Sequence, residues 1–191
     1  MIHGQLTVLR AIEREDLDLL WRWANDSRVM YYWAEPYRVT SREELAARYG
    51  AGMGGPTGQS HWLLIETADG VPIGRVGYVE LDRNNRHAEI AIQIGEPEFW
   101  GRGYGSDALV AFLGYLFYGL NLHKVWLRTG TFNERARRAY ARCGLREDGV
   151  FRDHTFLGGR YYDEVIMSIT EDEYRARYPF APPAGTEGGR S

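Results

Sequence analysis

The spacing of apolar residues along the chain predicts seven β-strands. Residues 6–12 alternate between apolar and polar side chains with the two-residue period of a half-buried strand. Two later runs flank an Ala-Asp-Gly turn, which predicts an antiparallel hairpin. The strands after the first are predicted at residues 61–66, 73–81, 88–94, 125–129, 145–150 and 161–169.

Segments with helical periodicity or end signals predict five helices, at residues 13–26, 41–50, 108–117, 133–142 and 171–178. Asn133 is a suitable N-cap for the fourth helix, and Gly144 ends it. The third helix is apolar nearly all round, which indicates that it is buried against a sheet. Because this helix joins the strands at 88–94 and 125–129, we expect these strands to be parallel neighbours joined by a right-handed crossover.

This order of elements predicts an α/β fold of the α+β type, in a single domain over residues 1–178. We expect a mixed, mainly antiparallel sheet of six to seven strands, flanked by about four to five helices, with a central βαβα unit. A chain of 191 residues is long enough for one well-buried core. The glycine-rich residues 51–60 are a candidate lid, and the Pro/Gly-rich residues 179–191 are expected to form a disordered tail.

Composition and charge argue against several classes of function. The formal net charge is −3 and Lys124 is the only lysine, so we expect no nucleic-acid partner. No apolar run is long enough to span a bilayer, so we expect no membrane partner. Cys143 is the only cysteine and no signal-peptide pattern is present, which favours a reducing cytoplasm. The five histidines lack metal-ligand spacing, so we expect no metal. A homo-oligomer, dimer or larger, stays open.

A glycine-rich segment at residues 96–107 separates a predicted strand from a predicted helix. Gly101, Gly103 and Gly105 let the backbone approach a ligand closely, and the first N–H groups of the following helix point to the same spot. A dinucleotide-binding loop would need an acidic residue about 20 positions later, and none occurs between Asp107 and Glu134. A nucleoside-triphosphate loop would need a lysine, which is missing. The segment therefore predicts an anion site, with a purely structural turn as the alternative.

A second motif makes the anion more specific. Asn133, Ala136, Tyr140 and Gly144 form an Asn-x-x-Ala-x-x-x-Tyr-x-x-x-Gly run. Together with the loop at residues 100–105, this run resembles the acetyl-CoA-binding signature of the GNAT superfamily of N-acetyltransferases. The resemblance spans about residues 5–170 and implies the GNAT fold, in which the central βαβα unit binds acetyl-CoA through its pyrophosphate. Trp100 departs from the Gln or Arg that usually begins the loop motif.

Within the superfamily, the chain is most similar to the branch that holds ribosomal-protein N-terminal acetyltransferases and bacterial spermidine N-acetyltransferases. Residues 9–17 and 86–90 are typical of the whole branch. Ala34 and Arg38 stand where the spermidine enzymes carry more acidic residues around Glu35. The segments that are closer to the spermidine enzymes are residues 29–37, 78–81 and 121–124.

The resemblance also implies which residues contact acetyl-CoA. The strand backbone at Ile92 to Ile94 would hold the acyl-pantetheine arm and polarise its carbonyl group. Asn133 would hydrogen-bond the pantetheine. The cofactor-binding residues expected in this way are Ile92, Gln93, Ile94, Trp100, Gly101, Arg102, Gly103, Tyr104, Gly105, Ser106, Asn133 and Arg135.

Two residues are expected to be catalytic. An alkylamine with a pKa of about 10 is protonated about a thousandfold over at pH 7, so acetyl transfer needs a base. By resemblance, Glu89 removes this proton, through water, although a solvent-facing strand acid is the simpler interpretation of the pattern. Also by resemblance, Tyr140 protonates the departing CoA thiolate. The alternative is a buried helix tyrosine with a satisfied hydroxyl group.

Aromatic and acidic side chains are candidates for the acceptor site. Glu35 and Glu80 would hold a cationic amine, while Tyr31, Tyr32 and Trp33 would offer ring faces for cation–π contacts. The same aromatic patch also fits a core or an oligomer contact. The sequence thus predicts direct attack of a primary amine in a ternary complex, with a polyamine such as spermidine favoured. Protein N-terminal amines, amine-bearing antibiotics and an acyl-CoA-binding sensor without turnover stay as alternatives.

Overall fold

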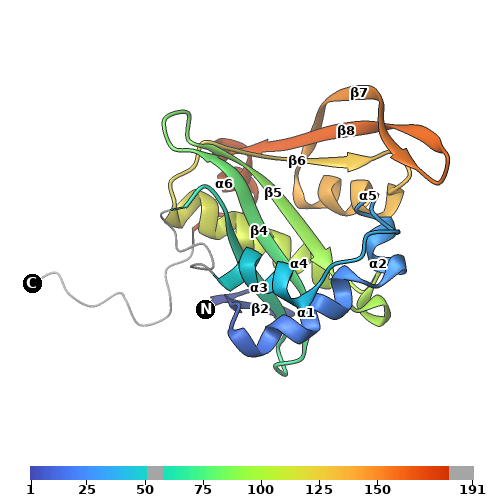
Figure 1. Cartoon of the computed structure of the whole chain (residues 1–191). Helices are drawn as coiled ribbons and strands as arrows, with labels where there is room; N and C mark the ends of the chain where they lie inside the picture. Colours follow the sequence, from blue (N-terminus) through green and yellow to red (C-terminus); the bar gives the residue numbers. More distant parts are fainter. Residues whose placement is uncertain (51–57, 181–191) are drawn as a thin grey trace, which may run out of the picture.

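The computed structural model describes residues 1–50 and 58–180, which form an eight-stranded sheet with helices on both faces (Figure 1). The strand order is β1-β2-β3-β4-β5-β6-β8-β7. Every neighbouring pair is antiparallel except β5 and β6, which are parallel as predicted. The strands are β1 (Ile2–His3), β2 (Thr7–Ala11), β3 (His61–Thr67), β4 (Pro72–Asp82), β5 (His87–Ile94), β6 (Lys124–Gly130), β7 (Arg146–Leu157) and β8 (Arg160–Thr170).

The predicted fold class is confirmed, with one strand more than expected. β1 has two residues, which is too short to show an alternating pattern. The predicted lid at residues 51–60 and the predicted tail at 179–191 lie largely outside the described residues. Within the described residues, no helix is long and apolar enough to cross a membrane.

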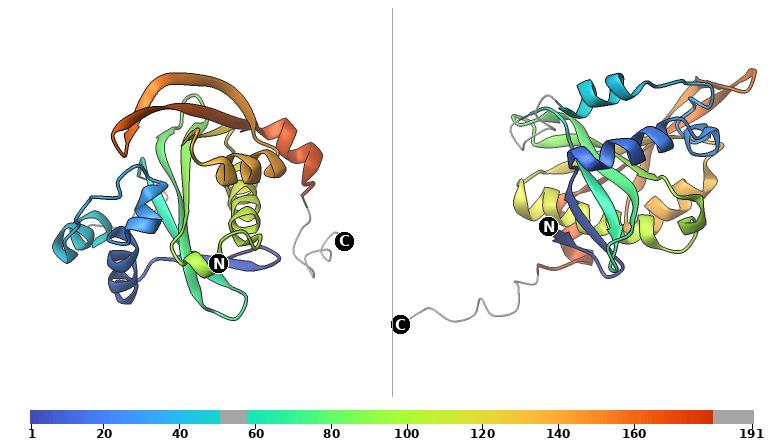
Figure 2. Two further views of the ribbon diagram at one scale, coloured as in Figure 1. Left: turned by 90° about the vertical axis from the view of Figure 1, so that its right-hand side faces the viewer. Right: turned by 60° about the horizontal axis from the view of Figure 1, so that its bottom comes forward.

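Six α-helices cover the sheet within the described part of the chain, one more than the upper expected number. The helix predicted at 13–26 is a 3-10 turn at Arg14–Asp16 followed by α1, and the additional helix is α2, which Asp26 caps by accepting a hydrogen bond from the Arg28 backbone N–H. α1 to α3 cover one face, and α4 and α5 cover the other (Figure 2). The helices are α1 (Leu17–Ala24), α2 (Ser27–Tyr31), α3 (Arg42–Gly50), α4 (Tyr104–Gly114), α5 (Glu134–Cys143) and α6 (Glu171–Arg177).

Two hydrophobic cores hold these layers together. On one face, Phe112 and Leu113 of α4 are fully buried in a cluster with Ile73 and Ile90 of the sheet. On the other face, Trp23 of α1 belongs to a smaller cluster beneath α1 and α3. Each fully buried side chain of this size contributes about 1.5–3 kcal/mol. Both faces of the central strands are therefore fixed by packing.

The pairing of β5 with β6 is short, and this shapes the centre of the sheet. Only three residue pairs join the two strands, and the last is Glu89 with Trp126. β5 nevertheless stays paired with β4 as far as Ile94, and β6 stays paired with β8 as far as Gly130. The two strands thus separate beyond their third pair, each held from its outer side.

The start of α4 is tied to the first hairpin by one carboxylate. Asp107 accepts hydrogen bonds from the backbone N–H groups of Gln5 and Leu6 at 2.8 and 2.9 Å and from the Thr7 hydroxyl at 2.6 Å. An acidic residue in the first helical turn also interacts favourably with the helix dipole. Asp107 therefore fixes the N-terminus of α4 relative to the sheet.

Candidate active site

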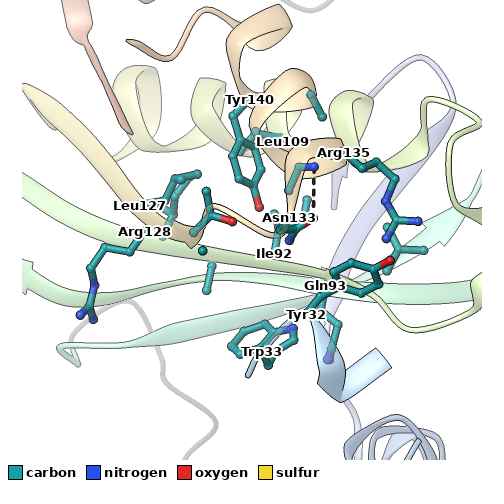
Figure 3. A pocket seen from close by; sticks show the side chains of 18 of the residues that line it. Tyr32, Trp33, Ile92, Gln93, Leu109, Leu127, Arg128, Asn133, Arg135 and Tyr140 are labelled. Carbon is teal, nitrogen blue, oxygen red and sulfur yellow. Dashed lines mark hydrogen bonds between the residues drawn. The ribbon is translucent and has the colours of Figure 1, made fainter. Parts of the chain in front are cut away.

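A cavity of about 400 Å³ lies where β5 and β6 separate. Its walls include Glu89–Ile94 of β5, Leu127–Gly130 of β6 and the first turns of α4 and α5 (Figure 3). Because side chains alternate along a strand, Ile90 and Ile92 face α4, whereas Glu89 and Gln93 face the side of α1 to α3. The cavity therefore connects the two faces of the sheet through its centre.

The backbone of β5 presents polar groups to this cavity. The Gly95 N–H donates to the Ile73 carbonyl oxygen at 2.8 Å. Backbone groups alternate in an antiparallel ladder, so those of Ile92 and Ile94 point away from β4 and into the gap. The Ile94 carbonyl oxygen accepts a hydrogen bond from Trp100 Nε1 at 2.8 Å, in agreement with this direction. The Ile92 N–H is therefore available to a carbonyl oxygen in the cavity.

Gln93 has a different orientation from its neighbours. In the same ladder its backbone groups face β4. Its side-chain oxygen accepts a hydrogen bond from Arg75 Nε at 2.9 Å. Arg75 is buried among aromatic rings, and this burial lowers its pKa to about 10. Gln93 thus lines the cavity from the side of α1 to α3, where its side chain is held in place.

The glycine loop begins α4 with an open anion site. Gly101 and Gly103 have φ angles of 74° and 92°, a left-handed conformation that a residue with a Cβ atom adopts only at a cost. Gly103 is the N-cap residue of α4 and supplies no side chain to cap the first N–H groups. Gly101, Gly103, Gly105 and Ser106 line the cavity, so these N–H groups can bind an anion.

Two predicted loop contacts have side chains elsewhere. The Arg102 side chain is exposed, and the Tyr104 ring packs on Phe99 at 5.3 Å between ring centroids. Neither residue is among those that line the cavity. At the start of a helix, successive side chains point in different directions around the axis. Arg102 and Tyr104 can therefore contribute only their backbone groups to the anion site.

Trp100, the unusual first residue of the loop motif, holds a cation at the cavity. The Arg135 guanidinium lies 4.3 Å from the Trp100 ring centroid and 4.7 Å from that of Tyr32. The two rings meet edge to face at 5.5 Å. All three residues line the cavity. The Trp100 ring holds the Arg135 guanidinium beside the cavity, and this positive charge suits an anion site.

α5 contributes a polar and a titratable group to the same wall. Asn133 caps the helix by accepting a hydrogen bond from the Ala136 N–H through its Oδ1 atom. Tyr140 follows two helical turns later on the same face and points into the cavity (Figure 3). Burial raises the pKa of Tyr140 to about 12, with a smaller contribution from Cys143. The hydroxyl group therefore stays protonated at neutral pH.

Charged side chains gather at the end of the cavity formed by β5, β6 and β8. Glu89 is buried, and Arg128 donates to its two oxygens at 2.9 and 3.3 Å. Arg128 Nη1 lies 3.7 Å from Glu164, and His154 Nε2 lies 3.5 Å from the same carboxylate. Hydrogen bonding to Glu89 raises the pKa of Arg128, so the guanidinium stays charged. The interpretation of Glu89 as a solvent-facing acid is wrong, because the side chain lies in the cavity wall.

The predicted acceptor residues divide into two groups. Tyr32 and Trp33 line the cavity, whereas Tyr31 packs against Tyr32 and Phe132 outside the lining. Glu35 pairs with Arg38 at 3.0 Å in a separate hollow, because the chain turns away after Ala34.

Glu80 is also absent from the cavity wall. It is exposed, with a φ of 51°, where the register between β4 and β5 shifts. Val79, rather than Glu80, pairs with Glu89, and although the charge of Glu80 helps to raise the pKa of Arg128, the residue does not line the cavity. The structure therefore does not bring Glu35 and Glu80 to the cavity, and the carboxylates present there are Glu89 and Glu164.

Sequence reasoning missed Arg128, His154 and Glu164. The strand containing Arg128 was predicted, but its pairing with β8 joins residues 34 or more positions apart and leaves no local pattern. Within the described residues, no group of three or more His, Cys, Asp or Glu side chains is arranged to hold a metal ion.

Comparison with known proteins identifies the family. A family model described as "Acetyltransferase (GNAT) domain" matches residues 7–146. The chain belongs to the GNAT acetyltransferases. Its catalytic class is thus an acetyl-CoA-dependent N-acetyltransferase, and the resemblance inferred from the two motifs is confirmed.

Spermidine N(1)-acetyltransferases are among the relatives of this GNAT acetyltransferase. The enzyme of Vibrio cholerae is 34% identical over 177 residues, which are 92% of this chain and 99% of the relative. The enzyme of Escherichia coli K12 is 33% identical over 171 residues, or 89% of each chain. The crystal structure of the Vibrio cholerae enzyme with CoA and spermine has a TM-score of 0.81 and 33% identity, covering 90% of this chain and 99% of that one.

The cavity of this GNAT acetyltransferase fits acetyl-CoA by its own chemistry. The uncapped N-terminus of α4 and Arg135 suit a pyrophosphate, and the Ile92 N–H suits the acyl carbonyl group. When bound, acetyl-CoA supplies an activated acetyl thioester.

The substitution Gly103→Ala tests the loop. An L-residue in the left-handed conformation costs about 1–2 kcal/mol, so the loop should relax and its N–H groups should move off the phosphate position. We expect the Kd for CoA, measured by titration calorimetry, to rise about tenfold, the equivalent of 1.4 kcal/mol. Gly149→Ala in β7 is the control, because a Cβ atom there meets nothing within 4 Å. Equal CoA affinity in both variants would contradict the anion site.

Proposed function

We propose that this acetyltransferase acetylates a primary amine of a polyamine such as spermidine, by direct attack in a ternary complex. The observation that carries the proposal is the excess of carboxylate at one end of the cavity. Among the described residues, Glu89 and Glu164 line that end together with one guanidinium, that of Arg128. A cationic acceptor is attracted there, while relatives at about 33% identity are spermidine N(1)-acetyltransferases.

The two substrates would approach from opposite faces of the sheet. Acetyl-CoA would lie on the face of α4 and α5, with its pyrophosphate at Gly103 and its pantetheine beside Asn133. Asn133 Oδ1 is engaged by the Ala136 N–H, so its amide nitrogen would donate to the pantetheine. The acceptor would enter along Tyr32 and Trp33 on the other face, whose rings suit an alkylammonium chain.

Glu89 would act as the base. Each carboxylate oxygen has two lone-pair sites, and Arg128 occupies one on each oxygen. The sites that remain can hold a water molecule, which passes the amine proton to the carboxylate. Arg128 keeps the carboxylate in a fixed orientation in this role.

Glu89→Gln tests the base through its pH dependence. At pH 7 only about one alkylamine molecule in a thousand is neutral, so loss of the base should lower kcat/KM about 100-fold. At pH 9.5 the free amine is abundant, and the deficit should shrink to less than about tenfold. Initial rates of thiol release from acetyl-CoA across this pH range measure the effect.

Glu147→Gln is the control for Glu89→Gln, since it removes one carboxylate from an exposed ion pair with Arg137. A deficit of Glu89→Gln that stays constant with pH would contradict the base role and indicate that Glu89 only positions Arg128.

Tyr140 would stabilise the sulfur of the departing CoA. An alkyl thiol has a pKa of about 8.5, so complete proton transfer from a hydroxyl with a pKa of about 12 is uphill by about 5 kcal/mol. The hydroxyl would therefore act first as a hydrogen-bond donor to the developing thiolate. The thiolate would leave hydrogen-bonded to the hydroxyl group and take its proton from solvent.

Tyr140→Phe removes this donor and keeps the ring. We expect kcat to fall about 100-fold, while the Kd for CoA changes less than about threefold. Steady-state assays of thiol release give kcat, and titration calorimetry gives the Kd for CoA. Tyr115→Phe, in the turn that follows α4, is the control, because Tyr115 does not line the cavity. Unchanged kcat in Tyr140→Phe would exclude the hydroxyl from the chemical step.

The acceptor itself is tested by thiol release from acetyl-CoA with a panel of amines. We expect spermidine and spermine to give kcat/KM values at least tenfold above those of aminoglycosides and of peptides with free N-termini. A preference for the peptides or the aminoglycosides would contradict the polyamine proposal. CoA binding without turnover of any amine would indicate a sensor domain.

A further inference from the structure

One carboxylate in the cavity has an oxygen that nothing in the described structure satisfies. Glu164 Oε2 is buried and has no hydrogen-bond partner among the described residues. Arg128 Nη1 and His154 Nε2 approach it to 3.7 and 3.5 Å, distances of attraction without a hydrogen bond. Glu89 differs, because both its oxygens accept hydrogen bonds from Arg128.

The sheet register places the Glu164 side chain in the cavity wall. Glu164 lies opposite Gly130 of β6, and Arg128 lies opposite Ile166, so both charged side chains are on the acceptor-facing side. Phe132 fills the space over Gly130, where a Cβ atom would meet its ring at 2.1 Å. Glu164 and Phe132 both line the cavity. An unsatisfied carboxylate thus lies beside an aromatic wall.

The charges around Glu164 leave a net negative site. Glu89 and Glu164 share the single guanidinium of Arg128, and its Nε and Nη2 atoms face Glu89 while Nη1 faces Glu164. Two carboxylates thus face one guanidinium, whose hydrogen bonds go to Glu89. A buried carboxylate oxygen with free lone pairs, such as Glu164 Oε2, loses hydration, and a ligand with N–H donors and positive charge compensates for that loss.

We infer that Glu164 binds an ammonium group of the acceptor other than the amine that is acetylated. The inference rests on the proposed function and assigns a specificity residue to it. A carboxylate in direct contact with the reacting nitrogen would favour its protonated form and oppose attack. A second nitrogen must stay charged, and Glu164 is the counter-charge for it, separated from Glu89 by the width of one guanidinium.

This arrangement selects diamines and polyamines over monoamines. A monoamine has one nitrogen, which must lose its proton near Glu89, and it leaves Glu164 unsatisfied. A diamine or polyamine fills both positions, with its methylene groups against Phe132 and Trp33. Selectivity thus arises because Glu164 Oε2 is a buried hydrogen-bond acceptor that only a substrate with a second ammonium group can satisfy.

The experiment compares 1,4-diaminobutane and spermidine with butylamine in the wild type and in Glu164→Gln at pH 8. A hydrogen bond to a charged group contributes about 1.5–3 kcal/mol, so the kcat/KM ratio of diamine to monoamine should fall about 10- to 100-fold. The loss should appear in KM for the diamine, with kcat, butylamine turnover and CoA affinity changed less than about threefold.

Two further variants separate binding from structure. Glu164→Asp keeps the charge and shortens its reach, so its ratio should lie between those of the wild type and Glu164→Gln. Glu147→Gln, in the exposed ion pair on β7, removes the same charge outside the cavity and should keep the wild-type ratio. Thermal melting checks that each variant is folded.

The outcomes distinguish this inference from the proposed function. Turnover of polyamines by the wild type with an unchanged ratio in Glu164→Gln overturns the role of Glu164 alone. An equal loss for monoamine and diamine also overturns it, since that result indicates a structural role. A wild type that acetylates no polyamine and shows no diamine preference overturns the proposed function, and the role of Glu164 with it.

Discussion

The separation of β5 and β6 after three paired residues is the constraint on which the site depends. β4 and β8 hold the two strands from outside, so within the described residues the inner backbone edge of β5 has no strand partner beyond Glu89. Unpaired backbone groups inside a protein are costly unless a ligand or water satisfies them. The sheet therefore carries a built-in position for an extended ligand with amide and carbonyl groups, and a passage between its two faces.

The glycine loop and α5 can be predicted from the sequence because the residues of each motif lie close together along the chain. Gly103 at a helix start and Asn133 seven residues before Tyr140 are spacing patterns, and the structure places all three in one wall. Glu35 and Glu80 show the limit of such reasoning: their residue type fits a cation, but the chain turns after Ala34 and Val79 takes the position opposite Glu89, so neither lines the cavity.

The parts that sequence could not supply depend on contacts between distant segments. Glu89 was chosen by resemblance, but its partner Arg128 lies on a strand 39 positions later. The place of Glu164 follows from the β6–β8 register, which no alternation of apolar residues specifies. Trp100 departs from the sequence motif, and its role in positioning Arg135 is visible only in the tertiary structure. Residue type and spacing along the chain thus predict sites built from local backbone, whereas networks of charged side chains from distant strands are visible only in the tertiary structure.

The charges of the cavity are arranged with opposite signs at its two ends. The N-termini of α4 and α5 and the guanidinium of Arg135 contribute positive potential at one end. Arg135 lies in the first turn of α5, where a cation is unfavourable unless an anion is bound nearby. At the other end, Glu89 and Glu164 outnumber Arg128. In the function we propose, a polyphosphate and a polycation would be drawn to opposite ends, so the thioester and the amine would meet at the point where the strands separate.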